Sequence, residues 1–150
     1  NPSASIGGPR SDTQVDGKLN GLFDDVTGDE AAIGETEYRC VYFINEDIDR
    51  DGLIDPVLWV AQQTPGSRTR IEFGIDPAGK NEQAPLLESM FIAPVGVVFS
   101  APSIKQSGTA LPGQPYHRND FAALWISRVV MPGAEAGEEH AILRLAGDTF

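Results

Sequence analysis

Short runs of alternating apolar and polar residues, separated by turns rich in glycine and proline, cover most of the chain. Two of them, residues 38–45 and 57–62, consist largely of β-branched, aromatic and other apolar residues, which is typical of buried strands. We expect these two strands to pair as a central hairpin. Further strands are expected at residues 69–75, 97–99 and 120–130 and after residue 140, the last two forming a second hairpin.

One short helix interrupts this pattern. Thr27 is followed three residues later by Glu30, a pair that caps helix N-termini by reciprocal hydrogen bonds, and Gly34 supplies a stop at the C-terminal end. Residues 86–93 fit a strand and a helical turn equally well. A count of about seven to eight short strands with one helix predicts an all-β fold, an antiparallel β-sandwich of immunoglobulin-like or jelly-roll type.

The chain of 150 residues suits one domain with a substantial core. We expect residues 1–20, which are polar and punctuated by glycine and proline, to form an extended N-terminal arm, and residues 21–150 to form a single β-sandwich domain. One of two alternating sets of the first strand should pack against apolar residues of later strands. The sets are Tyr38, Cys40, Tyr42 and Ile44, or Val41 and Phe43; the expected partners are Ile71, Phe73, Trp125, Leu143 and Leu145.

The loop between the two central strands carries the most specific chemical pattern. Carboxylates occupy alternate positions, a glycine follows, and another carboxylate comes three residues later, as in the first nine positions of an EF-hand calcium loop. Calcium is a hard cation that binds several oxygen atoms, and a glycine lets the chain turn around it. The candidate ligands are Asp47, Asp49, Asp51, Leu53 through its backbone carbonyl, and Asp55.

The match to an EF-hand ends at the twelfth position, where Leu58 replaces the usual glutamate. The flanking segments are also predicted strands, so we expect no EF-hand and only weak calcium affinity, with a Kd on the order of 0.1–1 mM. The alternative is an acidic turn, because aspartate favours turns without any ion. In that case the carboxylates repel one another and Arg50 offsets only one of them.

The composition of the chain excludes several kinds of binding partner and site. The formal net charge is −11, which argues against direct binding of nucleic acid, because phosphate contacts need clusters of lysine and arginine. No apolar run approaches the roughly 18 residues of a membrane-spanning helix, so we expect no membrane partner. Cys40 is the single cysteine, which excludes an intrachain disulfide and a zinc site built from thiolates. Its place in an apolar strand favours a buried core residue.

The sequence contains no familiar catalytic pattern: it has no G-x-S-x-G, no H-E-x-x-H and no glycine-rich phosphate loop. Its acidic pairs are adjacent in sequence, and adjacent residues on a strand point to opposite faces, so they do not suggest a hydrolase with two catalytic carboxylates. These pairs are Asp24–Asp25, Asp29–Glu30 and Glu138–Glu139. We expect no enzymatic activity and no cofactor other than calcium.

Several segments resemble small virion structural proteins of tailed bacteriophages. The matching points are SASIGG at residues 3–8, LFDDVTG at 22–28, TEYRC at 36–40, WVAQQTP at 59–65 and WISR at 125–128, so the resemblance spans most of the chain. It implies a non-enzymatic part of a phage particle. Its location would be the virion, assembled in the cytoplasm of the host cell.

Within a virion, we expect a decoration or cement protein that binds the capsid surface and stabilises the shell. Its partners would be the major capsid protein or other virion proteins, and it would form a homo-oligomer such as a trimer. A tail or fibre component is one alternative. Another is a calcium-stabilised carbohydrate-binding module, which would need Trp59 and Trp125 as an exposed, co-planar pair; core packing is the favoured interpretation of both tryptophans.

Overall fold

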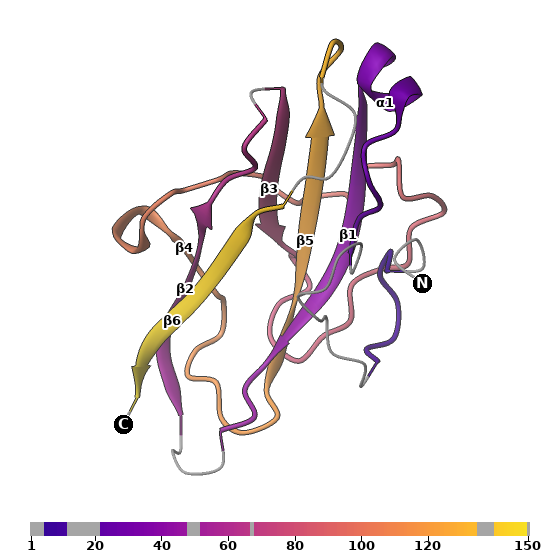
Figure 1. The fold of residues 1–150 in the computed structure, drawn as a ribbon. Helices are drawn as coiled ribbons and strands as arrows, with labels where there is room; N and C mark the ends of the chain where they lie inside the picture. Colours follow the sequence, from indigo (N-terminus) through magenta and orange to yellow (C-terminus); the bar gives the residue numbers. More distant parts are fainter. Residues whose placement is uncertain (1–4, 12–21, 48–51, 67, 135–139, 150) are drawn as a thin grey trace.

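The computed structural model describes residues 5–11, 22–47, 52–66, 68–134 and 140–149. Two three-stranded antiparallel sheets pack against each other, and one short helix lies beside the end of the first sheet (Figure 1). This arrangement confirms the predicted all-β sandwich. In the described part of the chain, no helix has the length and apolar character needed to cross a membrane.

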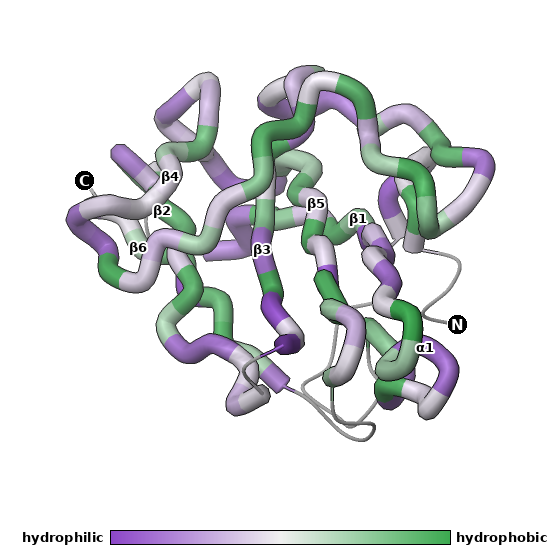
Figure 2. The backbone as a smooth tube through the Cα atoms, turned by 90° about the horizontal axis from the view of Figure 1, so that it is seen from above, coloured by the Kyte–Doolittle hydropathy of each residue, from purple (hydrophilic) through white to green (hydrophobic). Residues whose placement is uncertain are grey.

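The first sheet has the strand order β1–β5–β3. Its central strand β5 (Phe121–Val130) pairs with β1 (Glu35–Ile44) on one side and with β3 (Thr69–Ile75) on the other. The second sheet has the order β4–β2–β6. Here β2 (Leu53–Gln62) lies between the two-residue strand β4 (Thr109–Ala110) and β6 (Ile142–Thr149). Figure 2 shows the two sheets as neighbouring layers.

Both predicted hairpins are wrong. The strands β1 and β2 follow each other in sequence but lie in different sheets, and so do β5 and β6. The sequence did not reveal this because alternation shows which face of a strand is buried, not which strand lies beside it. In a sandwich, consecutive strands can bury their apolar sides by facing each other across the core.

Other strand boundaries also differ from the prediction. The strand β2 begins at Leu53, four residues before the expected start. Residues 86–93 and 97–99 form no strand; beside them only Ser100 makes an isolated bridge, to Phe73. The described residues contain six strands, β1 to β6, fewer than expected. The missing ones are irregular segments that lie on the sheets without extending them.

The predicted helix is confirmed as α1 (Gly28–Ile33). Thr27 Oγ1 accepts a hydrogen bond from the Glu30 N–H at 3.2 Å, and Glu30 Oε2 accepts one from the Thr27 N–H at 2.7 Å, which is the expected capping box. Gly34 ends the helix with a φ of +79°, a conformation that favours glycine. A Cβ at Gly34 would also lie 2.8 Å from Pro132 Cδ.

The core divides between the two faces of the first sheet. Val41 and Phe43 face the second sheet and belong to the main cluster, which includes Phe73 and Leu143. The alternate set, with Tyr38, Cys40 and Tyr42, lies on the outer face. The predicted partners therefore separate: Phe73, Leu143 and Leu145 pack in the cluster of the inner set, whereas Trp125 packs in that of the outer set. Ile71 is buried but belongs to neither cluster, so its predicted contact with β1 is wrong.

Cys40 is buried, as predicted. Burial, helped by the charge of Asp76, raises the pKa of the Cys40 thiol to about 12. The side chain is therefore a protonated thiol at neutral pH and behaves as a small apolar group.

The predicted N-terminal arm lies mostly outside the described residues, since these include only residues 5–11 of it. This part runs along β1 and the segment after residue 84. The Cys40 N–H donates to the Ser5 carbonyl at 2.6 Å, and the Leu87 N–H donates to the Ile6 carbonyl at 2.8 Å. The division into an arm and a single domain stays a prediction.

Candidate functional site

The predicted calcium loop is only partly covered by the described residues. Asp49 and Asp51 lie outside them, whereas Asp47, Leu53 and Asp55 are placed. The Asp47 N–H donates to Asn45 Oδ1 at 3.1 Å, so the loop leaves β1 through a turn held by an asparagine side chain. Because two of the five proposed ligands are not described, the calcium site stays a prediction.

The two ligands on the far side of the loop belong to β2. The Leu53 carbonyl accepts a hydrogen bond from the Tyr116 N–H at 3.0 Å, so only its second lone pair is available to an ion. Asp55 is exposed, has a φ of +48°, and lies at a bulge between Ile54 and Val57. Leu53 and Asp55 are therefore part of the strand β2, at positions where the EF-hand pattern requires ligands of the ion.

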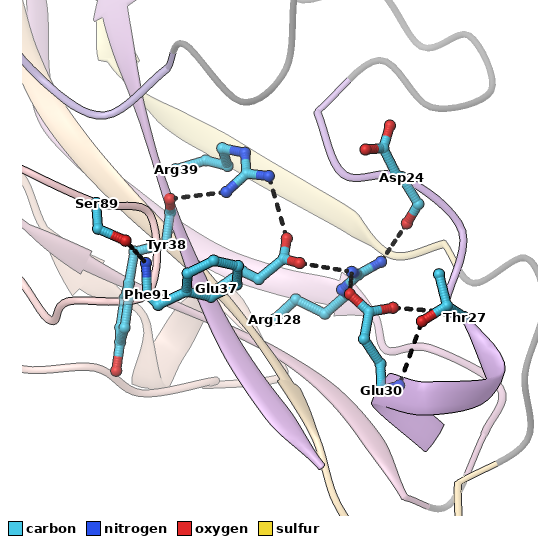
Figure 3. Close-up of polar contacts among 9 residues, drawn as sticks. All are labelled: Asp24, Thr27, Glu30, Glu37, Tyr38, Arg39, Ser89, Phe91 and Arg128. Atoms are coloured by element: carbon cyan, nitrogen blue, oxygen red, sulfur yellow. Dashed lines mark hydrogen bonds and ion pairs between the residues drawn. The ribbon is translucent and has the colours of Figure 1, made fainter. Parts of the chain in front are cut away.

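A charged cluster occupies one end of the first sheet beside α1 (Figure 3). Glu37 lies between two buried arginines, with its Oε2 3.1 Å from Arg39 Nη2 and its Oε1 3.3 Å from Arg128 Nη2. Arg128 Nη2 also lies 3.5 Å from Glu30 Oε1. Both guanidinium groups stack on the ring of Phe23, at 5.1 and 5.2 Å from its centroid. The cluster thus joins the helix and the segment before it to the sheet.

Three carboxylates of this cluster, Glu30, Glu35 and Glu37, have oxygen atoms within 4.8 Å of one another. Burial raises the pKa of Glu37 despite the opposing charge of Arg128, and burial together with the neighbouring Glu30 raises the pKa of Glu35. Burial also acts to raise the pKa of Glu30, but the hydrogen bond with the Thr27 backbone and those with Glu37 and Glu35 lower it. Glu30 therefore keeps its charge to lower pH than its neighbours.

Oxygen atoms at this spacing could bind a proton or a hard cation. Two of the three carboxylates, however, already contact the guanidinium of Arg128. The supported role of the cluster is therefore structural. The cluster was not predicted from the sequence, although Arg39 and Arg128 both occur within the segments TEYRC and WISR that carry the resemblance.

Residues 84–99, called the covering segment below, lie across the outer face of the first sheet. Their inward side chains complete a core cluster with β1 and β5. The cluster consists of Ala84, Leu87, Val97 and Phe99 from the segment and Tyr38, Cys40, Tyr42, Ala123 and Trp125 from the sheet. This packing fixes an irregular segment on a regular scaffold.

Backbone contacts hold the covering segment as well. The Tyr38 N–H donates to the Met90 carbonyl at 2.7 Å, and the Ala84 N–H donates to Tyr42 Oη at 3.0 Å. The segment also approaches β3 closely, because a Cβ at Gly74 would lie 2.4 Å from a methyl carbon of Val97. Contacts at several positions along the covering segment therefore determine its conformation.

The same segment exposes large apolar side chains on its solvent side. Val95 is 93% exposed and Val98 is 83% exposed. We call the set of five such residues the apolar surface; it consists of Leu86, Phe91, Ile92, Val95 and Val98. Exposed apolar side chains gathered on one ordered segment are typical of a protein-binding surface. The sequence signal was weak, because Pro94 and Gly96 break the run before any period is established.

The two tryptophans do not form a sugar-binding platform. Trp125 is completely buried, and its Nε1–H donates to Asp76 Oδ2 at 2.8 Å. Trp59 is half-buried on the other sheet and belongs to none of the core clusters of the described residues. The prediction of core packing is therefore confirmed for Trp125 and wrong for Trp59.

Comparisons of the chain with models of protein families, with curated proteins and with solved structures found no match.

Proposed function

We propose that the protein is a non-enzymatic structural component of a bacteriophage virion that decorates the capsid. Its apolar surface would bind the major capsid protein, and the sandwich would bridge neighbouring capsid subunits. The bound protein would strengthen the shell by adding contacts between subunits, not by any chemical reaction.

The observation that carries this proposal is the exposure of the covering segment. Leaving Val95 and Val98 in water is unfavourable by about 25 cal/mol per Å² of apolar surface, and that cost is recovered when a partner covers them. Because the segment is anchored to the sheet before any partner arrives, binding requires little further ordering of the chain. A pre-ordered apolar surface suits a protein that docks on a large, fixed assembly.

Two features of the sequence support the same interpretation. The resemblance to virion structural proteins includes SASIGG and TEYRC, and the described structure brings Ser5 and Cys40 of these two segments together through a backbone hydrogen bond. The net charge of −11 opposes non-specific aggregation of the free protein, which suits a protein present in many copies.

A tail or fibre component would use the same apolar surface with a different virion protein. The carbohydrate-binding alternative loses its specific support, because Trp125 is buried against Asp76. We therefore keep the tail or fibre role as the second candidate.

Two measurements test the proposal. The first is the density of the purified virion, in which the chain should occupy the outer capsid surface with Val95 and Val98 at the contact. The second is binding of the purified chain to capsids assembled without it. The double variant Val95→Asp/Val98→Asp should lose binding at least about tenfold, because it places charges in an apolar contact.

Ile33→Asp is the matched control. Ile33 is another exposed apolar residue, at 76% exposure, but it lies on α1 outside the covering segment. Its substitution should leave capsid binding unchanged. Density for the chain in the tail would refute the capsid role and support the tail or fibre role. Absence of the chain from purified virions would refute both roles.

A further inference from the structure

The strand β6 has an open outer edge. Within the described residues, it pairs with β2 alone, and no other backbone group bonds to it. The other long edges are covered by irregular segments. The Tyr38 and Cys40 N–H groups of β1 donate to Met90 and Ser5, and Phe73 of β3 exchanges two hydrogen bonds with Ser100. An eight-residue edge without proline or lysine is a ready template for another strand.

The direction of the backbone groups of β6 follows from its pairing with β2. Val60 lies opposite Leu143, yet the Val60 N–H donates to Pro102 on the other side of β2. In an antiparallel ladder, opposite residues exchange either both hydrogen bonds or none. Leu143 therefore points its N–H and carbonyl away from β2, and Leu145 does the same two residues on.

The side chains of β6 alternate with this pattern. Leu143 and Leu145 pack toward the core, whereas Arg144 and Asp148 are exposed on the outer face of the sheet. Both irregularities of the β2–β6 ladder insert their extra residue in β2, so the alternation along β6 is unbroken. Neither Arg144 nor Asp148 forms an ion pair or side-chain hydrogen bond with any other described residue.

We propose that the open edge of β6 binds β6 of a second copy of this chain, antiparallel and centred on Ala146. In this register the outward backbone groups of the two strands face each other. Arg144 of each copy lies opposite Asp148 of the other, so symmetry produces two ion pairs. They occupy positions without mutual backbone hydrogen bonds, where facing side chains lie closest.

The charges select this register over its neighbours. Centring the pair on Leu145 places Arg144 opposite Ala146 and forms neither ion pair. Centring it on Arg144 brings two arginines together on the symmetry axis, which is unfavourable. Self-pairing of one edge by a two-fold axis also closes the assembly, because no open edge of β6 remains.

The product is a continuous six-stranded sheet of order β4–β2–β6–β6–β2–β4. This dimer differs from the trimer expected from the sequence. It leaves the covering segment free, because that segment lies on the other sheet. The inference therefore does not rest on the proposed capsid role, and either can fail without the other.

Sedimentation equilibrium of the full chain at about 10–500 µM tests the dimer. The wild type should approach twice its 16.1 kDa mass as concentration rises. Arg144→Glu and Asp148→Arg should each weaken dimerisation roughly tenfold or more, since each replaces two attractive pairs by two repulsive ones. The double variant Arg144→Glu/Asp148→Arg should restore the wild-type affinity.

Arg70→Glu is the control, because Arg70 is an exposed arginine on β3, outside the proposed interface. It should leave the dimer constant unchanged. A wild type that stays monomeric or sediments as a trimer would overturn the proposal. Single variants that dimerise like the wild type, or a double variant that does not recover, would also overturn it.

Hydrogen exchange gives a second test that needs no variant. The amides of Leu143 and Leu145 face outward, so they should exchange slowly in the dimer and faster on dilution. The Arg144 amide faces β2 and should be protected at every concentration. Fast exchange of Leu143 and Leu145 throughout the concentration range would contradict the pairing.

Discussion

The indole Nε1–H of Trp125 donates a 2.8 Å hydrogen bond to Oδ2 of Asp76, and both side chains are buried. The two residues are 49 positions apart in sequence, and their contact ties the end of β3 to the middle of β5. A second oxygen of the same carboxylate accepts from the Ala78 N–H at 2.9 Å. Asp76 therefore satisfies a buried donor and shapes the turn after β3.

We expect Asp76→Ala to lower the free energy of unfolding by about 2–3 kcal/mol, because it leaves the Trp125 Nε1–H buried without an acceptor. Asp76→Asn keeps one acceptor oxygen for the Trp125 Nε1–H but loses the acceptor for the Ala78 N–H, so it should cost less than Asp76→Ala. Urea unfolding followed by tryptophan fluorescence measures both. Equal losses for the two variants would contradict a stabilising role for the hydrogen bond between Trp125 and Asp76.

The Phe73 side chain is completely buried in the main core cluster. Phe73→Ala should cost about 3–5 kcal/mol, through lost burial and the cavity that remains. Phe91→Ala on the apolar surface should change stability by less than about 0.5 kcal/mol, since Phe91 is 48% exposed. A loss below about 1 kcal/mol for Phe73→Ala would mean that the faces of β3 are assigned wrongly.

Gly7 lies where the N-terminal part approaches the covering segment. Its φ is +97°, and a Cβ there would lie 2.1 Å from the Pro85 carbonyl oxygen. Gly79 has a similar φ of +86° but open space around it. Gly79→Ala should cost about 1 kcal/mol from backbone strain, and Gly7→Ala at least about 2 kcal/mol, because the steric clash is added to the strain. Thermal unfolding of the two variants compares them directly, and similar losses would refute the close contact.

Asp120 links stability to pH. Burial acts to raise its pKa, but hydrogen bonds from Asn81, the His117 N–H and Lys80 lower it below the ordinary value of 3.8. This stabilisation is complete above that value and is lost as pH falls through the lowered pKa. Asp120→Asn should cost about 1 kcal/mol at pH 6, and its difference from the wild type should shrink below about pH 3.8.

Urea unfolding at pH 6 and at pH 3 measures this change. Glu82→Gln is the control, because Glu82 is an exposed acid of the same region whose side chain forms no hydrogen bond or ion pair with another described residue. It should show no such convergence at low pH. A deficit for Asp120→Asn that is the same at both pH values would contradict the linkage.

The calcium prediction rests on the loop sequence. Binding only to the folded state would stabilise the protein by RT ln(1 + [Ca²⁺]/Kd), about 1.4 kcal/mol at a tenfold excess over Kd. The melting temperature should therefore rise with calcium, less with magnesium, and not at all in Asp49→Ala. A melting curve unchanged by chelator would leave the loop as an acidic turn.

Local features of the fold could be predicted from the sequence, whereas pairing could not. Thr27 and Glu30 form a helix cap by contacts within four residues, and the alternation at residues 69–75 matches β3 at both ends. Strand partners depend on which chain segments meet across the core. A strand shows the same alternation of apolar and polar residues whether it pairs with the next strand in the same sheet or faces that strand across the core.

The candidate sites show the same limit. Arg39 alternates with apolar residues and so looks like an exposed position of β1, yet it is 1% exposed. Its burial requires Glu37, Phe23 and Arg128 to surround it, and these come from three separate segments. In the covering segment, Val95 and Val98 are apolar and would be expected in the core from residue type alone. Only the path of the segment over the sheet shows that they are exposed.

The separation of consecutive strands into different sheets affects how the chain folds. Neither β1 nor β5 can find its partner through a short turn, and Arg128 meets Glu30, which is 98 positions away in sequence. Closing such a loop lowers the entropy of the chain before any stabilising contact has formed. Folding should therefore be slow for a domain of this length, on the order of milliseconds to seconds. During that delay the first strands are exposed, and newly synthesised chains are at greatest risk of aggregation before β5 is made.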